Sequence, residues 1–119
     1  RRKNANILSE GIRKISGLTP PSVKDHVKHV FYQYVVRVEE DYLMERNELV
    51  EHLKEKGVGA AVHYPTPVYG QPLYKELGYG KTVCPMAEDV CKRIASLPVH
   101  PLVAREDIKY MLNILKDIP

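Results

Sequence analysis

The sequence predicts an α+β domain, in which a small sheet of two or three strands is covered by helices. In several segments apolar residues recur every three or four positions, as in an amphipathic helix, while two shorter segments alternate like strands. With 119 residues and 44% hydrophobic content, the chain can bury a core without disulfide bonds. We therefore expect a single domain over residues 1–119, with helices layered on one face of the sheet.

The first helix is expected to run from the start of the chain to about Gly17. Its apolar stripe consists of Ile7, Leu8, Ile12 and Ile15. Pro20 and Pro21 do not continue a helix, so residues 18–28 are expected to form a polar connection. The chain starts with arginine inside a helical pattern. A fragment of a longer protein and a trimmed stand-alone protein both explain that start.

Two strands and a helix are expected next. Residues 30–38 are rich in β-branched and aromatic residues and alternate in the manner of a strand. A helix should follow from an N-cap at Asp41 to Lys56, ended by Gly57. Its buried stripe would be Leu43, Leu49, Val50 and Leu53. Residues 58–63 form the second expected strand, with Val58, Ala60 and Val62 on one face.

The next segment is rich in proline and glycine. Residues 64–72 contain three prolines and predict an ordered but irregular loop. A short helix is expected over 71–77, ended by Gly78. Pro85 suits the first position of another helix, where its missing N–H has no cost. The inner face of that helix would comprise Ala87, Val90, Cys91 and Ile94.

The chain is expected to finish with an extended segment and a helix. Residues 96–99 are extended before Pro101. The last helix has an apolar face made of Ile108, Met111, Leu112 and Leu115. No conventional N-cap residue precedes it, so Glu106 and Asp107 must stabilise its N-terminus.

Composition excludes several classes of function. The net charge is only +3 and the basic residues are scattered, which argues against a dedicated nucleic-acid surface. No apolar run is long enough to cross a bilayer and no signal peptide is recognisable, so we expect no membrane contact and a cytoplasmic location. Cys84 and Cys91 lie about two helical turns, roughly 10 Å, apart, too far for a disulfide. His26 and His29 have no further ligands at metal-site spacing, so no metal is expected.

Residues 63–71, His-Tyr-Pro-Thr-Pro-Val-Tyr-Gly-Gln, are the strongest candidate for a binding site. They follow an expected strand directly, and their prolines fix the path of the chain. His63, Tyr64, Tyr69 and Gln71 offer hydrogen-bonding groups suited to a polar, planar or sugar-like ligand. The alternative is a rigid structural turn whose tyrosines pack on the last helix. Composition alone leaves both interpretations open.

A series of motifs along the whole chain resembles the C-terminal small domain of the DegT-type, perosamine synthase-like sugar aminotransferases. The series starts with the Arg-Arg-rich helix at residues 1–8 and the hydrophobic strand at 34–38, followed by Arg46 with Leu49, Leu53 and Gly57. It continues in order with His63-Tyr64-Pro65-x-Pro67, Gln71-Pro72-x-Tyr74, Gly78-Tyr79, Pro85-x-Ala87-Glu88, Ser96-Leu97-Pro98 and Pro101-Leu102. Each piece is weak, but nine in the right order are specific.

The resemblance implies a larger enzyme than this chain. Family members are similar to fold-type-I aminotransferases that transfer an amino group from an amino acid, usually glutamate, to a keto-sugar nucleotide. Their pyridoxal phosphate (PLP) sits in a large domain, whose Schiff-base lysine would lie upstream of Arg1. Residues 1–17 would be the interdomain-type helix and 18–119 the substrate-side domain. The expected partners are that large domain, the sugar nucleotide and a second copy in a homodimer.

The same resemblance implies roles for individual residues. No catalytic residue is expected in this fragment, which alone should bind no cofactor and be inactive. His63, Tyr64, Tyr69 and Gln71 would face the substrate. The family usually has histidine where Tyr69 stands; tyrosine still donates a hydrogen bond to phosphate or hydroxyl but lacks the positive charge. The alternative function is a stand-alone or regulatory binding module derived from this domain, without catalysis.

Overall fold

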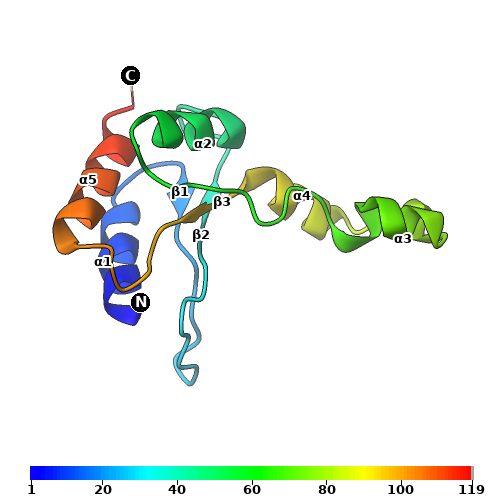
Figure 1. Ribbon diagram of the computed structural model, residues 1–119, viewed down its shortest axis with the longest axis horizontal. Coiled ribbons are helices and arrows are strands. Elements are labelled where there is room, and N and C mark those ends of the chain that lie inside the picture. The colour runs from blue at the N-terminus through cyan, green and yellow to red at the C-terminus, as the bar shows by residue number, and fades with distance from the viewer. Residues whose placement is uncertain (119) are drawn as a thin grey trace.

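The computed structural model describes residues 1–118 and has the expected α+β architecture. Its helices are α1 (Arg2–Ile12), α2 (Arg46–Glu55), α3 (Pro72–Glu76), α4 (Pro85–Arg93) and α5 (Arg105–Lys116). The strands are β1 (Leu18–Thr19), β2 (Tyr34–Val38) and β3 (Ile94–Leu97), and two short 3-10 helices are η1 (Val68–Gly70) and η2 (Tyr79–Lys81). Figure 1 shows how these elements are arranged.

The three strands form one antiparallel sheet in the order β1-β2-β3. In its register Leu18 faces Val38 on one side of β2, and Tyr34 faces Leu97 on the other. An isolated bridge between Ala61 and Ser96 adds a short extended segment beside β3. This bridge is all that forms of the strand expected over 58–63, although Val58 and Ala60 are buried as predicted.

Helices α1, α2 and α5 cover one face of the sheet (Figure 1). The core there is built from alternate residues of β2 and β3 together with the apolar stripes of the three helices: Ala5, Leu8, Ile12, Tyr34, Val36, Val38, Leu49, Leu53, Ala95, Leu97, Ile108, Met111 and Leu115. Two buried tyrosine hydroxyls have hydrogen-bond partners within this core. The Tyr34 hydroxyl lies 2.9 Å from the Ser9 hydroxyl, and Tyr42 donates to the Leu115 carbonyl at 2.7 Å.

Strand β2 is shorter than the sequence predicts because its neighbours end. In the register of Leu18 with Val38, Pro20 and Pro21 would stand beside Val36 and Val35, and prolines have no N–H for the ladder. Val35 and Val36 stay in the strand because they pair with β3, but β3 ends at Leu97 opposite Tyr34, so residues 30–33 have no partner strand. They belong to a connection that runs away from the sheet (Figure 1), in which Phe31 alone is buried.

Helix α2 begins later than predicted, at Arg46 rather than after Asp41. Glu45 is the true N-cap, and it forms a reciprocal capping box with Glu48. Leu43 consequently lies outside the helix and is 74% exposed, whereas the rest of the expected stripe is buried. At the other end Gly57 takes the left-handed conformation that was expected, with φ of 78°.

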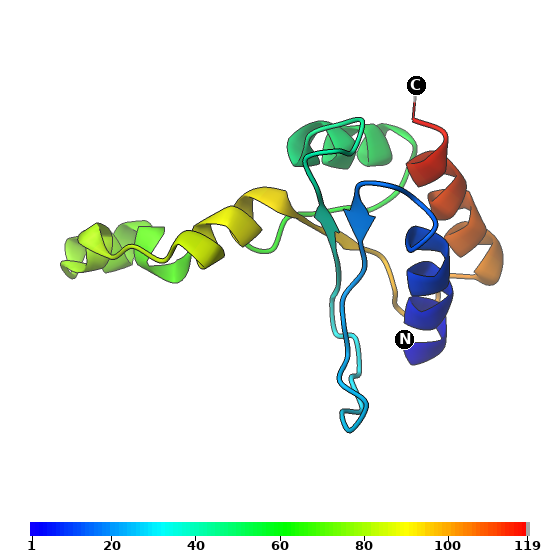
Figure 2. The same ribbon diagram turned by 180° about the vertical axis from the view of Figure 1, so that it is seen from behind.

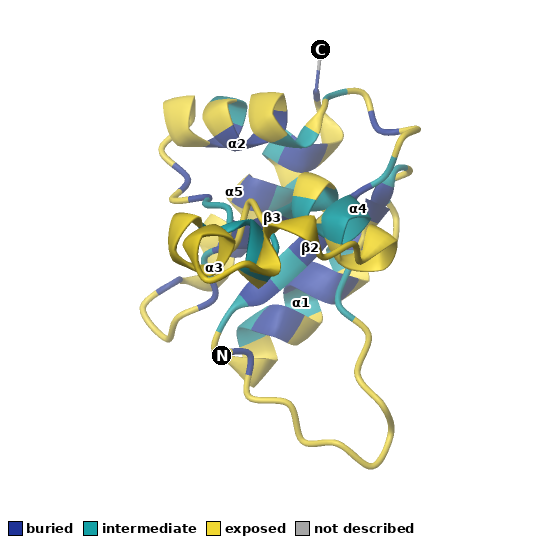
Figure 3. Cartoon of the chain, turned by 90° about the vertical axis from the view of Figure 1, so that its right-hand side faces the viewer, coloured by how far each residue is buried: buried dark blue, intermediate teal, exposed yellow. Residues whose placement is uncertain are grey.

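Residues 64–86 form a projection that we call the arm, and no residue in it is buried. It contains η1, α3 and η2 and extends away from the sheet, as Figures 1 and 2 show from opposite sides. Figure 3 shows the same segment almost entirely exposed. The predicted inner face of α4 is wrong for Ala87, which is exposed, because α4 reaches the sheet only at its C-terminal end. No helix among the described residues has the length and apolarity needed to cross a membrane.

Candidate functional site

The loop of residues 63–71 leaves the sheet after the Ala61 bridge and enters the arm. Its prolines hold extended backbone: Pro67 has ψ of 156° and precedes the single turn of η1. Within the loop, Gln71 Nε2 donates to the Thr66 hydroxyl at 3.4 Å. Gln71 then serves as N-cap of α3, with Pro72 at the first helical position. The loop therefore has one well-defined path.

Tyr69 connects this loop to the start of α4. Its hydroxyl donates to Glu88 Oε1 at 2.6 Å, and the backbone N–H of Cys84 donates to the Tyr69 oxygen and to Glu88 Oε1, both at 3.2 Å. The carboxylate favours the neutral phenol, so the pKa of Tyr69 is raised to about 12. The same hydrogen bond lowers the pKa of Glu88. We call this group the Tyr69–Glu88 tie.

The four residues predicted from the sequence do not converge on one point. Tyr69 is engaged in the Tyr69–Glu88 tie, and Gln71 bonds within the loop. His63 and Tyr64 lie edge to face with ring centroids 5.9 Å apart, and Tyr64 is 67% exposed. His63 lines a groove on the sheet instead. Their role in binding a substrate stays a prediction.

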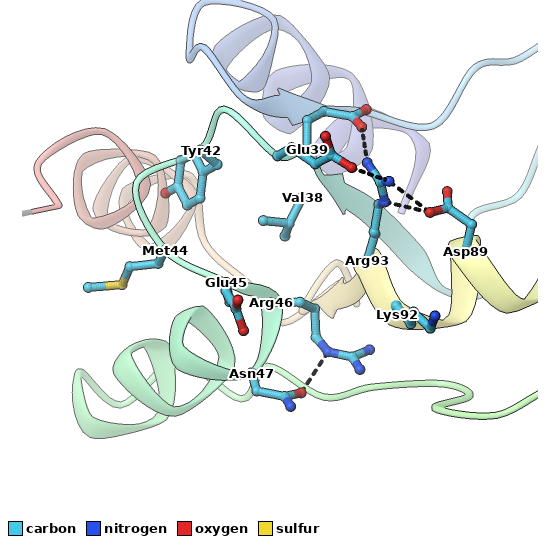
Figure 4. Close-up of a pocket in the computed structure, with 11 residues that line it drawn as sticks. Val38, Glu39, Tyr42, Met44, Glu45, Arg46, Asn47, Asp89, Lys92 and Arg93 are labelled. Carbon is cyan, nitrogen blue, oxygen red and sulfur yellow. Dashed lines mark hydrogen bonds and ion pairs between the residues drawn. The ribbon is translucent and has the colours of Figure 1, made fainter.

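A cavity of about 640 Å³ lies elsewhere, between the end of β2, the start of α2 and α4 (Figure 4). Arg93 lines this cavity and pairs with several acidic side chains. Its guanidinium nitrogens lie 2.8 Å from carboxylate oxygens of both Glu40 and Asp89, and 3.8 Å from a carboxylate oxygen of Glu39. A hydrogen bond from the Thr19 hydroxyl, with help from Arg37, lowers the pKa of Glu39. The ion pairs of Arg93, on α4, with Glu39 and Glu40, which follow β2, hold α4 against the sheet.

Arg46 completes that cavity from the α2 side. Its Nη1 donates to the carbonyl oxygens of Cys91 at 2.9 Å and Ile94 at 3.0 Å. These carbonyls lie where α4 ends and β3 begins, and Arg46 supplies the donors they otherwise lack. The sequence indicated Arg46 only as part of a family motif, and the role of Arg93 in this cavity was not predicted. The spacing of Asp89 and Arg93, four residues apart on a helix, was the available signal for Arg93.

Residues 1–118 hold no lysine in the kind of pocket that a PLP cofactor requires. A PLP site needs a lysine held in a water-excluded pocket with groups that bind the phosphate and the ring nitrogen. Every lysine among the described residues is exposed. In residues 1–118 no group of three or more His, Cys, Asp or Glu side chains could hold a metal ion, and Cys84 and Cys91 are both free thiols.

Solved structures similar to this chain include aminotransferases. DesV from Streptomyces venezuelae, solved with a ketimine intermediate, is 25% identical with a TM-score of 0.83, and the match covers 98% of this chain and 30% of DesV. A sugar-aminotransferase candidate from Streptococcus pneumoniae, solved in its PLP form, is 27% identical with a TM-score of 0.85, covering 97% and 29% of the two chains. The fold is therefore that of one part of an aminotransferase.

The family model of DegT/DnrJ/EryC1/StrS aminotransferases matches residues 1–116, and the chain belongs to this family. A dTDP-3-amino-3,6-dideoxy-α-D-galactopyranose transaminase from Aneurinibacillus thermoaerophilus is 32% identical over 78% of this chain and 24% of its own length. A protein named pleiotropic regulatory protein from Geobacillus stearothermophilus is 36% identical over 95% of this chain and 30% of its own. The chain thus spans less than a third of these relatives.

Proposed function

We propose that this chain is the substrate-side domain of a PLP-dependent enzyme that transfers an amino group from an amino acid, with glutamate as donor, to a keto-sugar nucleotide. The family match over residues 1–116 is the observation that carries the proposal. The names of relatives add support, because they include transaminases of dTDP-linked and UDP-linked sugars.

In this proposal the large domain supplies the cofactor chemistry, and this chain supplies residues that bind the substrate. PLP, when bound by the large domain of the parent protein, supplies the electron sink that amino transfer requires. The residues present here bind and orient: His63 lies where the loop leaves the sheet, Tyr64 and Gln71 follow on its fixed path into the arm, and the Tyr69–Glu88 tie anchors that loop to α4. In this proposal α1, with the turn to residue 17, joins the two domains, and residues 18–119 form the domain on the substrate side of the active site.

The exposed apolar side chains of the arm are a second argument for a larger parent protein. Its apolar side chains are exposed in this chain, with exposed fractions from 57% to 80% for Tyr64, Val68, Leu73, Leu77, Tyr79, Val83 and Met86. Such a run of exposed apolar side chains is typical of a surface that meets another protein surface. We assign its cover to the large domain of the parent protein, which acts as a homodimer.

The test is a pair of substitutions in the full-length parent. His63→Ala and Tyr69→Phe should each weaken turnover of the sugar nucleotide, by a few kcal/mol at most, without changing the visible absorbance of the bound cofactor. His26→Ala, in the exposed stretch of residues 22–30, is the matched control and should change neither. Unchanged turnover in both variants would mean that the loop is structural, and loss of cofactor absorbance would move the loop to the cofactor site.

A regulatory binding module is the second candidate function. It is favoured by the names of two relatives, the pleiotropic regulatory protein and an erythromycin biosynthesis sensory transduction protein from Saccharopolyspora erythraea that is 31% identical over 88% of this chain. This reading predicts a parent protein that binds a sugar nucleotide but has no Schiff-base lysine. Borohydride reduction of the purified parent separates the two, because it fixes the cofactor covalently only where that lysine is present.

A further inference from the structure

Phe31 is the one buried residue in the connection of residues 22–33, whose other residues are exposed or half-buried. It is 6% exposed and belongs to the hydrophobic core, where its ring centroid lies 6.0 Å from that of Tyr34 on β2. Phe31 also lines a cavity of about 180 Å³ beside α1, together with Ser9 of that helix. Burial of this single side chain therefore anchors the connection to the rest of the fold.

The backbone of Phe31 has a conformation that a large side chain seldom adopts. Its φ is 48°, the only positive φ of a residue other than glycine within residues 1–118. This left-handed region suits glycine and costs free energy for a bulky residue, so it persists only where surrounding contacts hold it. The turn at Phe31 therefore depends on the contacts that the residue makes.

His29 supplies two of these contacts. Its Nδ1 accepts a hydrogen bond from the backbone N–H of Phe31 at 3.0 Å, and the two rings lie edge to face with centroids 4.4 Å apart. A ring nitrogen accepts a hydrogen bond only when it carries no proton, so this bond requires the neutral form of His29. Protonation turns Nδ1 into a donor, which faces the Phe31 N–H without being able to bind it.

The charged groups around this turn come from α1, from the residue before it and from the same exposed stretch: Arg1, Glu10, Arg13, Asp25, His26 and Lys28. Within residues 1–118 none of them forms an ion pair with His29. Tyr34, which packs on Phe31 from β2, stays neutral because burial raises its pKa. The hydrogen bond to Phe31 is therefore the contact that depends directly on the charge of His29.

We propose that His29 is a pH-sensitive switch for the connection of residues 22–33, in which the neutral ring holds Phe31 against α1 and the protonated ring releases it. Histidine is the side chain whose ordinary change of charge falls between about pH 5 and pH 8. On protonation the partly buried N–H of Phe31 loses its acceptor, and an unpaired donor at such a site is destabilising. The released form is favoured in acid, while the sheet and the helices stay folded. The inference does not need the proposed function.

The experiment uses Phe31 as its reporter, because it is the only phenylalanine in the chain. Isotope-labelled phenylalanine in the 119-residue chain gives one set of NMR signals, which is followed from about pH 8 to about pH 5 at constant ionic strength. We expect the amide to lose its hydrogen-bonded shift and the ring to lose its contact with Tyr34 over the same pH range. The ratio of held to released Phe31 should fall about fivefold, the effect of one hydrogen bond. Circular dichroism that showed the whole chain unfolding over this range would contradict a local switch.

Substitutions of His29 separate the acceptor from its charge. His29→Asn keeps an acceptor that does not titrate, because an asparagine side chain also bonds the backbone two residues on, so Phe31 should stay held throughout the pH range. His29→Leu removes the acceptor and should shift Phe31 toward the released form at every pH. His26→Asn, in the same exposed stretch, is the matched control and should leave the pH response intact. A Phe31 signal that does not respond to pH, or that responds equally in His29→Asn, would overturn the proposal.

Discussion

At the scale of single residues, one short hydrogen bond determines how the candidate loop is held. The Tyr69–Glu88 tie raises the pKa of Tyr69 to about 12. Replacing the carboxylate in Glu88→Gln should lower the pKa of Tyr69 toward the ordinary value of 10.0, because the neutral amide no longer opposes formation of a phenolate. Tyrosinate absorbance across alkaline pH measures this, with Tyr69→Phe identifying which of the eight tyrosines responds. An unchanged Tyr69 titration would contradict the bond.

The same tie predicts a dependence of stability on acid. The hydrogen bond from Tyr69 holds the pKa of Glu88 in the folded chain below its ordinary value of 4.5. A lowered pKa means that the ionised group stabilises the fold above the unfolded pKa, and that this contribution disappears as pH falls through the folded pKa. The difference in unfolding free energy between the unsubstituted 119-residue chain and Glu88→Gln should therefore be present at pH 7 and vanish in stronger acid. Urea unfolding at several pH values checks this, and a difference that persists in strong acid would refute it.

Two glycines in left-handed conformations form a matched pair. Gly17 has φ of 77°, and a Cβ there would lie 2.5 Å from backbone atoms of Tyr42. Gly57 has φ of 78°, with nothing within 4 Å of such a Cβ. Gly57→Ala should thus cost only the conformational strain, about 1–2 kcal/mol of unfolding free energy. Gly17→Ala should cost clearly more, because backbone must also move. Equal losses in urea unfolding would show that Tyr42 does not pack against Gly17.

At the scale of elements, Arg46 is the side chain that joins α2 to the junction of α4 and β3. It satisfies the carbonyls of Cys91 and Ile94 and is itself half-buried, so its pKa is lowered by desolvation. Arg46→Met should lower the unfolding free energy by about 2 kcal/mol, the range for hydrogen bonds from a charged donor. Lys54→Met, which removes an exposed ion pair with Glu51, is the control and should cost less than about 1 kcal/mol. Similar losses in the two variants would argue against the Arg46 contacts.

The elements also show which features the sequence could predict. Helix stripes such as Leu49 and Leu53, and the Gly57 stop, follow from period and local chemistry, and these were predicted correctly. Boundaries that depend on a partner were not. Strand β2 begins only at Tyr34 because its partner β3 ends at Leu97, a pairing that no local pattern shows. The start of α2 was predictable in principle from the Glu45–Glu48 capping box, which competes with the weaker signal at Asp41.

For the candidate site, the sequence predicted the loop but not its contacts. The composition of residues 63–71 was informative because prolines and hydrogen-bonding side chains are adjacent in the chain. The Tyr69–Glu88 tie joins residues 19 positions apart, and the groove brings His63 beside Ser96 and His100. Such contacts depend on how β3 lies beside the Ala61 segment. Ser96 is 8% exposed, and its hydroxyl has no hydrogen-bond partner within residues 1–118. The sequence carries no signal for this, because burial depends on how distant segments pack.

At the scale of the whole molecule, the arm differs from the rest in having no buried residue. Its extension contributes to the longest dimension of 48 Å, against a shortest of 25 Å. We predict that backbone amides of residues 64–86 exchange with deuterium much faster in the 119-residue chain than in the full-length protein, where the large domain covers them. Amides of β2 and β3 should be protected in both. An arm protected to the same degree in the isolated chain would show that it needs no cover.

The central claim is that this chain works as one domain of a PLP-dependent sugar aminotransferase, and the native protein tests it most directly. Antibodies against the 119-residue chain would isolate the protein that contains it from its source cells, for measurement of intact mass, bound PLP and amino transfer from glutamate to keto-sugar nucleotides. We predict a mass far above 13.6 kDa, a PLP-bound protein and formation of an amino-sugar nucleotide. A native mass near 13.6 kDa, or a larger protein that neither binds PLP nor transfers an amino group, would contradict the claim.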